Sequence, residues 1–145
     1  MRRTWAPTLR FLPPFWNVCL ALYGLTLAAA THWPAGATPE AGAALLEKVG
    51  DKWLHMAAFA GLAVLAAGVW TGLRGLKPRS AFILLTIISL YAAVDESTQG
   101  LVPGRNPDVL DWAADTIGAA AGLSVYWGAS LGFRVSGFGF WGRMR

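Results

Sequence analysis

SAFILLTIISLYAAVDESTQGL, residues 80–101, is an apolar run that carries Asp95, Glu96 and Gln99 near its C-terminal end. A run of about 20 apolar residues is long enough to cross a bilayer as a helix. A charged side chain at the centre of such a helix costs roughly 2.5–3.5 kcal/mol on insertion scales, so acids within the membrane usually face a protein interior or a wet cavity. This run therefore predicts a membrane-spanning helix, and its acids indicate a functional site. Gln99 follows Asp95 by four residues and Glu96 by three, so we expect the three side chains to form a polar corner on this helix.

Three further apolar blocks surround this run, and the loops between most of them are short. The chain has 145 residues, of which 55% are hydrophobic and only 14% charged, which is typical of a membrane protein. We expect an all-α integral membrane protein, a single transmembrane domain over residues 1–145 folded as a four-helix bundle. The predicted spans are residues 11–30, 53–73, 80–101 and 112–133.

The charges separate by side of the membrane in this topology. The basic residues of one side are Arg2, Arg3, Arg10, Arg74, Lys77, Arg79, Arg134, Arg143 and Arg145. All eight acids fall on the other side: Glu40, Glu47, Asp51, Asp95, Glu96, Asp108, Asp111 and Asp115. By the positive-inside rule both termini are cytoplasmic and the acids face outward, which in a bacterium places the chain in the inner membrane. The net charge of +4 thus reflects orientation in a membrane, and we expect no nucleic-acid partner.

An alternative for the first apolar block is a cleaved signal peptide, because a basic start precedes it and small residues, Ala28 to Ala30, end it. Cleavage would leave three spans and the same outward acids. The outer loop that follows contains Thr38, Pro39 and Glu40, a pattern typical of a helix start. We expect a short interfacial helix there that ends near Gly50.

The start of the second span combines Asp51, Lys52 and His55. Asp51 and His55 are one helical turn apart and share a face, so Asp51 is a natural partner for the imidazole. Two interpretations remain open for each: Asp51 can serve as a helix cap, and His55 can be a structural histidine with satisfied ring nitrogens.

The turn after residue 101 brings two helices side by side. Pro103 and Gly104 predict a tight turn, and Asn106 with Pro107 predicts the cap and first position of the next helix. We expect Arg105, between them, to fold over the acids. On the following helix, one stripe contains Asp108, Asp111, Asp115, Gly118 and Gly122. The glycines allow another backbone to approach closely, and Asp108 has the simpler interpretation of a favourable interaction with the helix dipole.

The predicted site contains more negative than positive groups. Six acids face Lys52, Arg105 and, when protonated, His55. In a partly dry pocket this excess requires protonated carboxyls or a bound cation, either a divalent metal or a cationic group of a ligand. The one cysteine, Cys19, excludes an intramolecular disulfide and a thiol-based metal motif.

Across residues 51–122 the sequence resembles the VanZ-like membrane protein family. The residues that carry the resemblance are Asp51, Lys52, His55, Asp95, Glu96, Gln99, Pro103, Gly104, Arg105, Asp111, Gly118 and Gly122. The family commonly has asparagine where this chain has Asp115, which adds a negative charge here. The resemblance implies a small polytopic protein of the bacterial envelope, and the family's namesake is associated with resistance to the glycopeptide teicoplanin.

The preferred hypothesis is an outward site that binds a lipid headgroup or another envelope ligand. The candidate ligand-binding residues are Asp51, Lys52, His55, Asp95, Glu96, Gln99, Arg105, Asp108, Asp111 and Asp115. A second hypothesis is a metal-dependent or acid/base enzyme that acts on a lipid-linked substrate, although Ser97 and Thr98 lack an activating motif. A third is a structural subunit of a membrane complex, with membrane-protein partners and a polar cluster that only holds the helices together.

Overall fold

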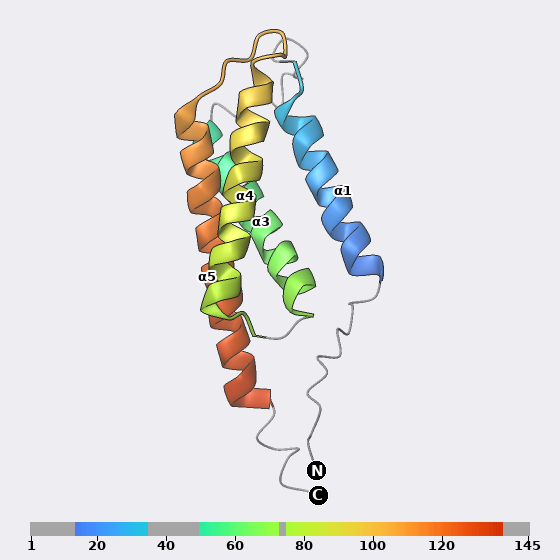
Figure 1. Cartoon of the computed structure of the whole chain (residues 1–145), viewed down its shortest axis with the longest axis vertical. Helices are drawn as coiled ribbons and strands as arrows, with labels where there is room; N and C mark the ends of the chain where they lie inside the picture. The colour runs from blue at the N-terminus through green and yellow to red at the C-terminus, as the bar shows by residue number, and fades with distance from the viewer. Residues whose placement is uncertain (1–13, 35–49, 73–74, 138–145) are drawn as a thin grey trace, which may run out of the picture.

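The computed structural model describes residues 14–34, 50–72 and 75–137. These residues form four helices: α1 (Pro14–Thr31), α3 (Asp51–Thr71), α4 (Pro78–Gln99) and α5 (Val109–Gly137) (Figure 1). The all-helical prediction is confirmed. The interfacial helix predicted after Thr38 lies outside the described residues, apart from Gly50 at its expected end.

Two of these helices, α3 and α4, are long and apolar enough to cross a membrane. The apolar part of α1, Phe15–Thr31, is shorter. Apolar side chains also remain exposed on the outside of the helices, as expected where lipid surrounds a bundle, because lipid tails are as apolar as the side chains. Examples are Leu22, Leu25, Phe82, Leu90, Val94, Ile117 and Val125. These features suggest a membrane environment.

Three of the helices begin before the predicted apolar spans, because polar residues extend their first turns. Helix α3 includes Asp51 at its first position, and the residue before it, Gly50, occupies the cap position with a φ of 81° that favours glycine. Asp51 is therefore not the cap of this helix. The prediction that α5 begins at Asn106 and Pro107 was wrong. Asp108 caps it instead, since its Oδ1 accepts the backbone N–H of Leu110 at 2.9 Å.

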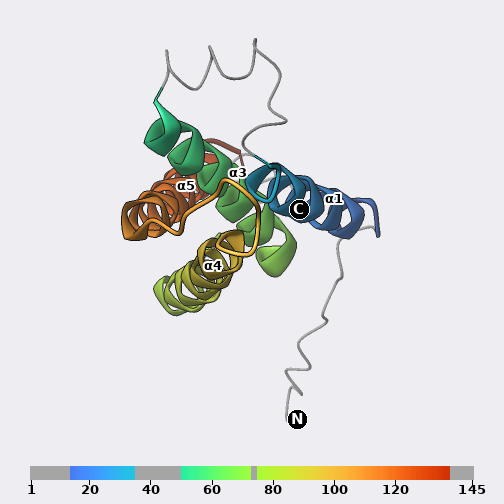
Figure 2. The ribbon, with the colours of Figure 1, turned by 90° about the horizontal axis from the view of Figure 1, so that it is seen from above.

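The helices alternate in direction, so the polar segments of the sequence gather at one end (Figure 1). Helices α1 and α4 end there, and α3 and α5 begin there. We call this the polar end. At the opposite end lies the connection from α3 to α4, with the exposed residues Lys77 at the cap position of α4 and Arg79 in its first turn. Seen along the bundle, α3 lies between α1 and α5 and also contacts α4 (Figure 2).

The closest helix pair is α3 and α5, and glycines make this approach feasible. A Cβ atom added at Gly118 would lie 2.2 Å from the carbonyl oxygen of Met56, and one at Gly122 would lie 2.3 Å from that of Ala60. No side chain fits at either position. The prediction that this stripe receives another backbone is confirmed, and the neighbouring core is made of Phe59, Leu62, Ala63, Ala67, Leu84, Ile88, Ala92, Ala119 and Leu123.

Candidate functional site

The residues predicted for the site all lie at the polar end, on three helices and one loop. They are Asp51, Lys52 and His55 of α3, Asp95, Glu96 and Gln99 of α4, Arg105 and Asp108 of the α4–α5 loop, and Asp111 and Asp115 of α5. Five of these side chains are buried although they are polar: Asp95, Glu96, Gln99, Asp111 and Asp115. Every buried side-chain nitrogen and oxygen atom of the described residues has a hydrogen-bond partner. The arrangement is therefore a set of paired polar groups.

His55 pairs across the α3–α5 interface with Asp115, which is only 1% exposed. The distance from His55 Nδ1 to Asp115 Oδ1 is 2.9 Å. An ionised carboxylate only accepts hydrogen bonds, so Nδ1 donates. The partner expected from the sequence, Asp51, lies on the other side of the ring, with its Oδ1 3.8 Å from Nε2. The pairing explains how the additional charge of Asp115 is accommodated inside the bundle.

Lys52 joins the start of α3 to the start of α5. Its Nζ donates to Asp108 Oδ2 at 2.6 Å and also to Asp111 Oδ1. The Lys52 ammonium, helped by the backbone N–H of Leu110, holds the pKa of Asp108 below its ordinary value of 3.8. Asp108 thus has two roles, as a helix cap and as a partner of Lys52.

The three polar residues at the end of α4 form the corner that the sequence predicts. Gln99 Nε2 donates to Asp95 Oδ2 at 3.3 Å and to Glu96 Oε2 at 3.2 Å. The second oxygen of Glu96, Oε1, accepts the backbone N–H of Asp108 at 2.5 Å. Glu96 therefore fastens the α4–α5 loop onto α4, and this corner faces the protein interior.

Two residues at the end of α1 belong to the same network and were not predicted. Thr31 Oγ1 donates to Asp95 Oδ1 at 3.1 Å. His32 contacts the carbonyl oxygen of Ala28 through Nδ1 at 2.9 Å, and its Nε2 lies 2.9 Å from Thr98 Oγ1. The signal in the sequence is their position directly after the first apolar run, which is level with the polar ends of the other helices.

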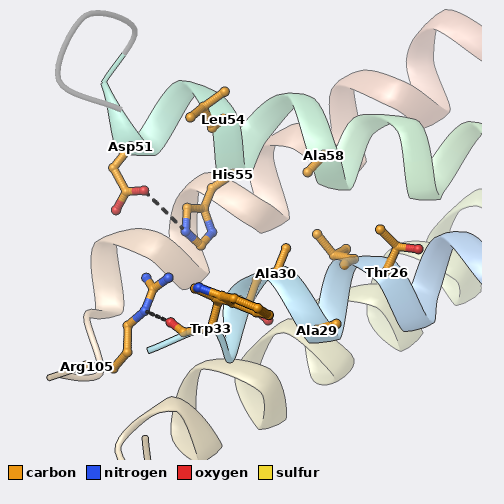
Figure 3. Close-up of a pocket in the computed structure, with 11 residues that line it drawn as sticks. Thr26, Ala29, Ala30, Trp33, Asp51, Leu54, His55, Ala58 and Arg105 are labelled. Atoms are coloured by element: carbon orange, nitrogen blue, oxygen red, sulfur yellow. Dashed lines mark hydrogen bonds and ion pairs between the residues drawn. The ribbon is translucent and has the colours of Figure 1, made fainter. Parts of the chain in front are cut away.

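Arg105 lies at the same pocket as Asp51 but is not in ion-pair contact with an acid among the described residues. Its Nε donates to the carbonyl oxygen of Trp33 at 3.2 Å, which ties the loop to the end of α1. Its terminal nitrogens point toward the side on which Asp51 and His55 lie (Figure 3).

A groove of about 560 Å³ runs between α1 and α3 beside Arg105. Its walls are apolar along most of their length and include Leu27, Ala29, Ala30, Leu54 and Ala58. At the polar end its mouth is lined by Asp51, His55, Trp33 and Arg105 (Figure 3). A long apolar trough with charged groups at one end fits an amphipathic molecule.

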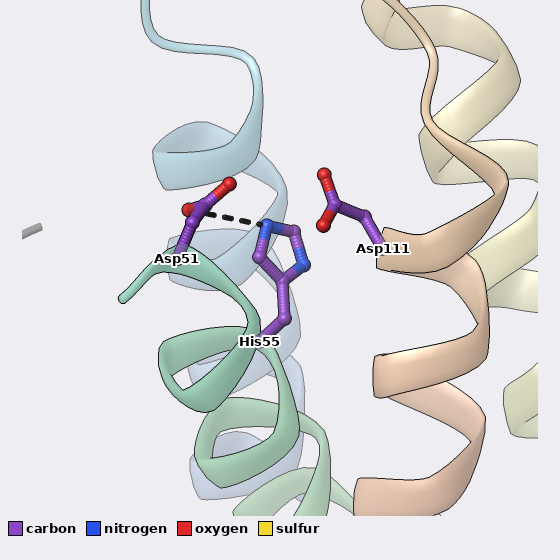
Figure 4. Close-up of side chains that lie close together, drawn as sticks. All are labelled: Asp51, His55 and Asp111. Atoms are coloured by element: carbon purple, nitrogen blue, oxygen red, sulfur yellow. Dashed lines mark ion pairs between the residues drawn. The ribbon is translucent and has the colours of Figure 1, made fainter. Parts of the chain in front are cut away.

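Three ligand-type side chains also converge near this mouth. One ligand atom from each of Asp51, His55 and Asp111 lies within 4.8 Å of the others (Figure 4). Among the described residues, these are the side chains that could together hold a metal ion.

An all-helical fold with two helices apolar enough for a membrane, and with buried polar groups gathered at one end, defines a small helical protein suited to a bilayer. Comparison with protein families makes the assignment specific. The family model described as VanZ/LLP1 matches residues 11–132, so the chain belongs to the VanZ/LLP1 family. The match includes α1, α3 and α4 entirely and most of α5. Searches of curated proteins and of solved structures gave no significant match.

Proposed function

We propose that the chain is a bacterial inner-membrane protein in which all four helices span the bilayer. Both termini lie in the cytoplasm, and the polar end faces outward. The support is the separation of charge along the bundle, since exposed Lys77 and Arg79 lie at one end and the acids at the other. Helix α3 has 21 residues and α4 has 22, and each matches the thickness of a hydrocarbon layer of about 30 Å.

The polar end binds an envelope ligand that carries a headgroup and a hydrocarbon chain. The groove between α1 and α3 is the observation that carries this proposal, because it joins apolar walls to a charged mouth. Of the predicted ligand-binding residues, Asp51, His55 and Arg105 line the groove and would contact the headgroup. The buried residues Asp95 and Glu96 stand behind it and hold α1, α4 and the loop in place.

The headgroup that fits this mouth combines a phosphate, which would contact Arg105, with a hydroxyl or amine that would donate to Asp51. A guanidinium can bind a phosphate through two parallel hydrogen bonds, and Arg105 uses only Nε in its bond to Trp33. His55 and the hydrocarbon-sized trough beside it fix the orientation, with the chain running toward the middle of the bundle. A phospholipid or a lipid-linked cell-wall precursor has this chemistry.

Binding of a short-chain phosphatidylglycerol to the purified protein tests the proposal. We expect Arg105→Gln to weaken binding by about tenfold or more, in keeping with the loss of a charge-assisted contact of about 1.5–3 kcal/mol. Arg79→Gln is the matched control, because it removes the same charge at the opposite end of the bundle and should leave the affinity unchanged. Equal affinities of wild type and Arg105→Gln would reject the headgroup site.

A resistance phenotype is the corresponding proposal for the cell, and family membership supports it. Expression in a glycopeptide-sensitive bacterium should raise the teicoplanin concentration that inhibits growth. Asp95→Asn and Arg105→Gln, expressed at the level of the wild type, should remove this increase. If both variants protect as well as the wild type does, the polar end has no part in resistance.

The hydroxyls next to the acids donate within their own helix, since Ser97 Oγ donates to the carbonyl oxygen of Ala93 at 2.6 Å and Thr98 Oγ1 to that of Val94 at 2.9 Å. Thr98 Oγ1 also lies 2.9 Å from Nε2 of His32, so a histidine that could act as a general base is beside one of the two hydroxyls. The proposal of ligand binding therefore rests on the groove and not on the lack of a nucleophile.

A further inference from the structure

The second ring nitrogen of His55, Nε2, lies near the carboxylates of Asp51 and Asp111. The His55 side chain is only 9% exposed, and Nδ1 is committed to Asp115. With the proton on Nδ1, Nε2 of the neutral ring carries a lone pair. A carboxylate oxygen of Asp51 lies 3.8 Å from Nε2, and it can accept a hydrogen bond but cannot donate one. Asp111 brings a second carboxylate to the same space (Figure 4).

Three acceptors that converge in this way repel one another unless a cation balances them, and among the described residues the Lys52 ammonium contacts Asp111 but is not paired with Asp51 or His55. The distances are close to those of a metal site, because bonds of about 2.0–2.2 Å to nitrogen and oxygen place two donors about 3.4 Å apart in a tetrahedral arrangement. His55 Nε2 and Asp51 Oδ1 are 3.8 Å apart, so a small rotation of the half-exposed Asp51 side chain is needed to bring them to that separation. Rotation of the Asp111 carboxyl brings the remaining ligand atom in from its present separation of up to 4.8 Å.

We infer that Asp51, His55 and Asp111 bind one divalent transition-metal cation at the mouth of the groove. One imidazole and two carboxylates, without a thiolate, favour Zn²⁺ or Mn²⁺ over the harder Mg²⁺ and Ca²⁺. Asp115 is then a positioning residue, because a carboxylate that accepts the other N–H of a ligating histidine fixes its tautomer and orientation. The two carboxylates neutralise the ion, so the site also reduces the excess of negative charge at the polar end.

Lys52 is the competitor of this ion within the protein. The Lys52 ammonium donates a hydrogen bond to Asp111, and it also donates to Oδ2 of Asp108 at 2.6 Å. When a metal binds, Lys52 can keep Asp108 and release Asp111. All the donors come from this chain, so the metal site does not depend on the lipid ligand proposed above.

Calorimetric titration of the purified full-length protein with Zn²⁺ and Mn²⁺, together with metal analysis, tests the inference. We expect one tightly bound ion and much weaker binding of Mg²⁺. Asp51→Asn, on a partly exposed side chain in the first turn of α3, should lower the affinity by about tenfold or more. Glu47→Gln is the matched control, because it removes one carboxylate of the predicted outward side that is neither a proposed ligand nor a described partner of Lys52, and it should change the affinity by less than about threefold.

A second variant is expected to raise the metal affinity instead of lowering it. Lys52→Met removes the competing ammonium and should raise the affinity for Zn²⁺, which a merely structural role of these residues does not predict. Equal affinities of Asp51→Asn and Glu47→Gln would overturn the inference, because they would indicate diffuse attraction of the metal ion to the acids of this side. Failure of both wild type and Lys52→Met to bind Zn²⁺ or Mn²⁺ would overturn it as well, and would identify a proton on His55 as the balancing cation.

Discussion

Replacing Gly118 by alanine should force α3 and α5 apart and disrupt the site one turn away. The added Cβ would lie 2.2 Å from the carbonyl oxygen of Met56, whereas ordinary contact begins at 3.4 Å, so relief requires a separation of about 1.2 Å. Backbone atoms on both sides leave no flexible group to yield. The same movement stretches the 2.9 Å bond between His55 and Asp115 beyond hydrogen-bond distance.

The magnitude follows from three contributions. Overpacking of a close interface costs about 1–3 kcal/mol, and loss of a buried hydrogen-bonded pair costs about 1–3 kcal/mol more. Alanine returns about 0.5–1 kcal/mol relative to glycine within a helix. The free energy of unfolding should therefore fall by about 1–5 kcal/mol.

Unfolding of the detergent-solubilised protein, followed by circular dichroism during titration with a denaturing detergent, measures this change. Gly128→Ala is the control, because that glycine is on the same helix with no neighbouring atom within 4 Å of an added Cβ. It should be as stable as wild type or slightly more stable. If Gly118→Ala and Gly128→Ala have the same stability, α3 and α5 do not approach as described.

Three further expectations concern single polar contacts. Asp115→Asn keeps an oxygen that accepts from His55 and should destabilise less than Asp115→Ala, which leaves a buried N–H unpaired at about 1–3 kcal/mol; equal losses in thermal unfolding would contradict this pairing. Lys52 lowers the pKa of Asp108, so this ion pair stabilises the fold above the ordinary pKa of 3.8, and its contribution disappears as the pH falls through the lower pKa of the folded state. The difference in stability between wild type and Asp108→Asn should therefore close below about pH 4. A difference that stays constant with pH would refute the stabilising role of this ion pair. Tyr23→Phe removes the 2.8 Å bond that joins α1 to a carbonyl of α3 and should cost about 1 kcal/mol, with no change if α1 packs elsewhere.

The sequence predicted those features of the fold and the site that depend only on the position of a residue along one helix. Apolar blocks predicted the helices, the spacing of Gly118 and Gly122 predicted the close interface, and Gln99 was placed beside Asp95 and Glu96 because turn neighbours within a helix are fixed by its geometry. These features need no knowledge of how the helices are rotated relative to one another.

Partners across helices could not be predicted in the same way. His55 was assigned to Asp51 on its own helix, yet its close partner is Asp115 of α5, because the rotation of α3 turns Nδ1 toward α5. Arg105 was expected over the acids, but it contacts the residue that follows α1. Arg105 lies in a loop, and the path of a loop cannot be read from helical periodicity. His32 was overlooked for the same reason, since its significance appears only once α1 lies against α4.

The central claim is that the polar end, with its groove, faces away from the cytoplasm. Labelling of intact cells with a membrane-impermeant thiol reagent tests it most directly, using Asn106→Cys at the exposed α4–α5 loop and Lys77→Cys at the opposite end, both with Cys19 replaced by alanine. We expect Cys introduced at 106 to be labelled in intact cells and the one at 77 to be labelled only after the membrane is permeabilised. The reverse pattern would contradict the outward site and, with it, the proposed envelope ligand.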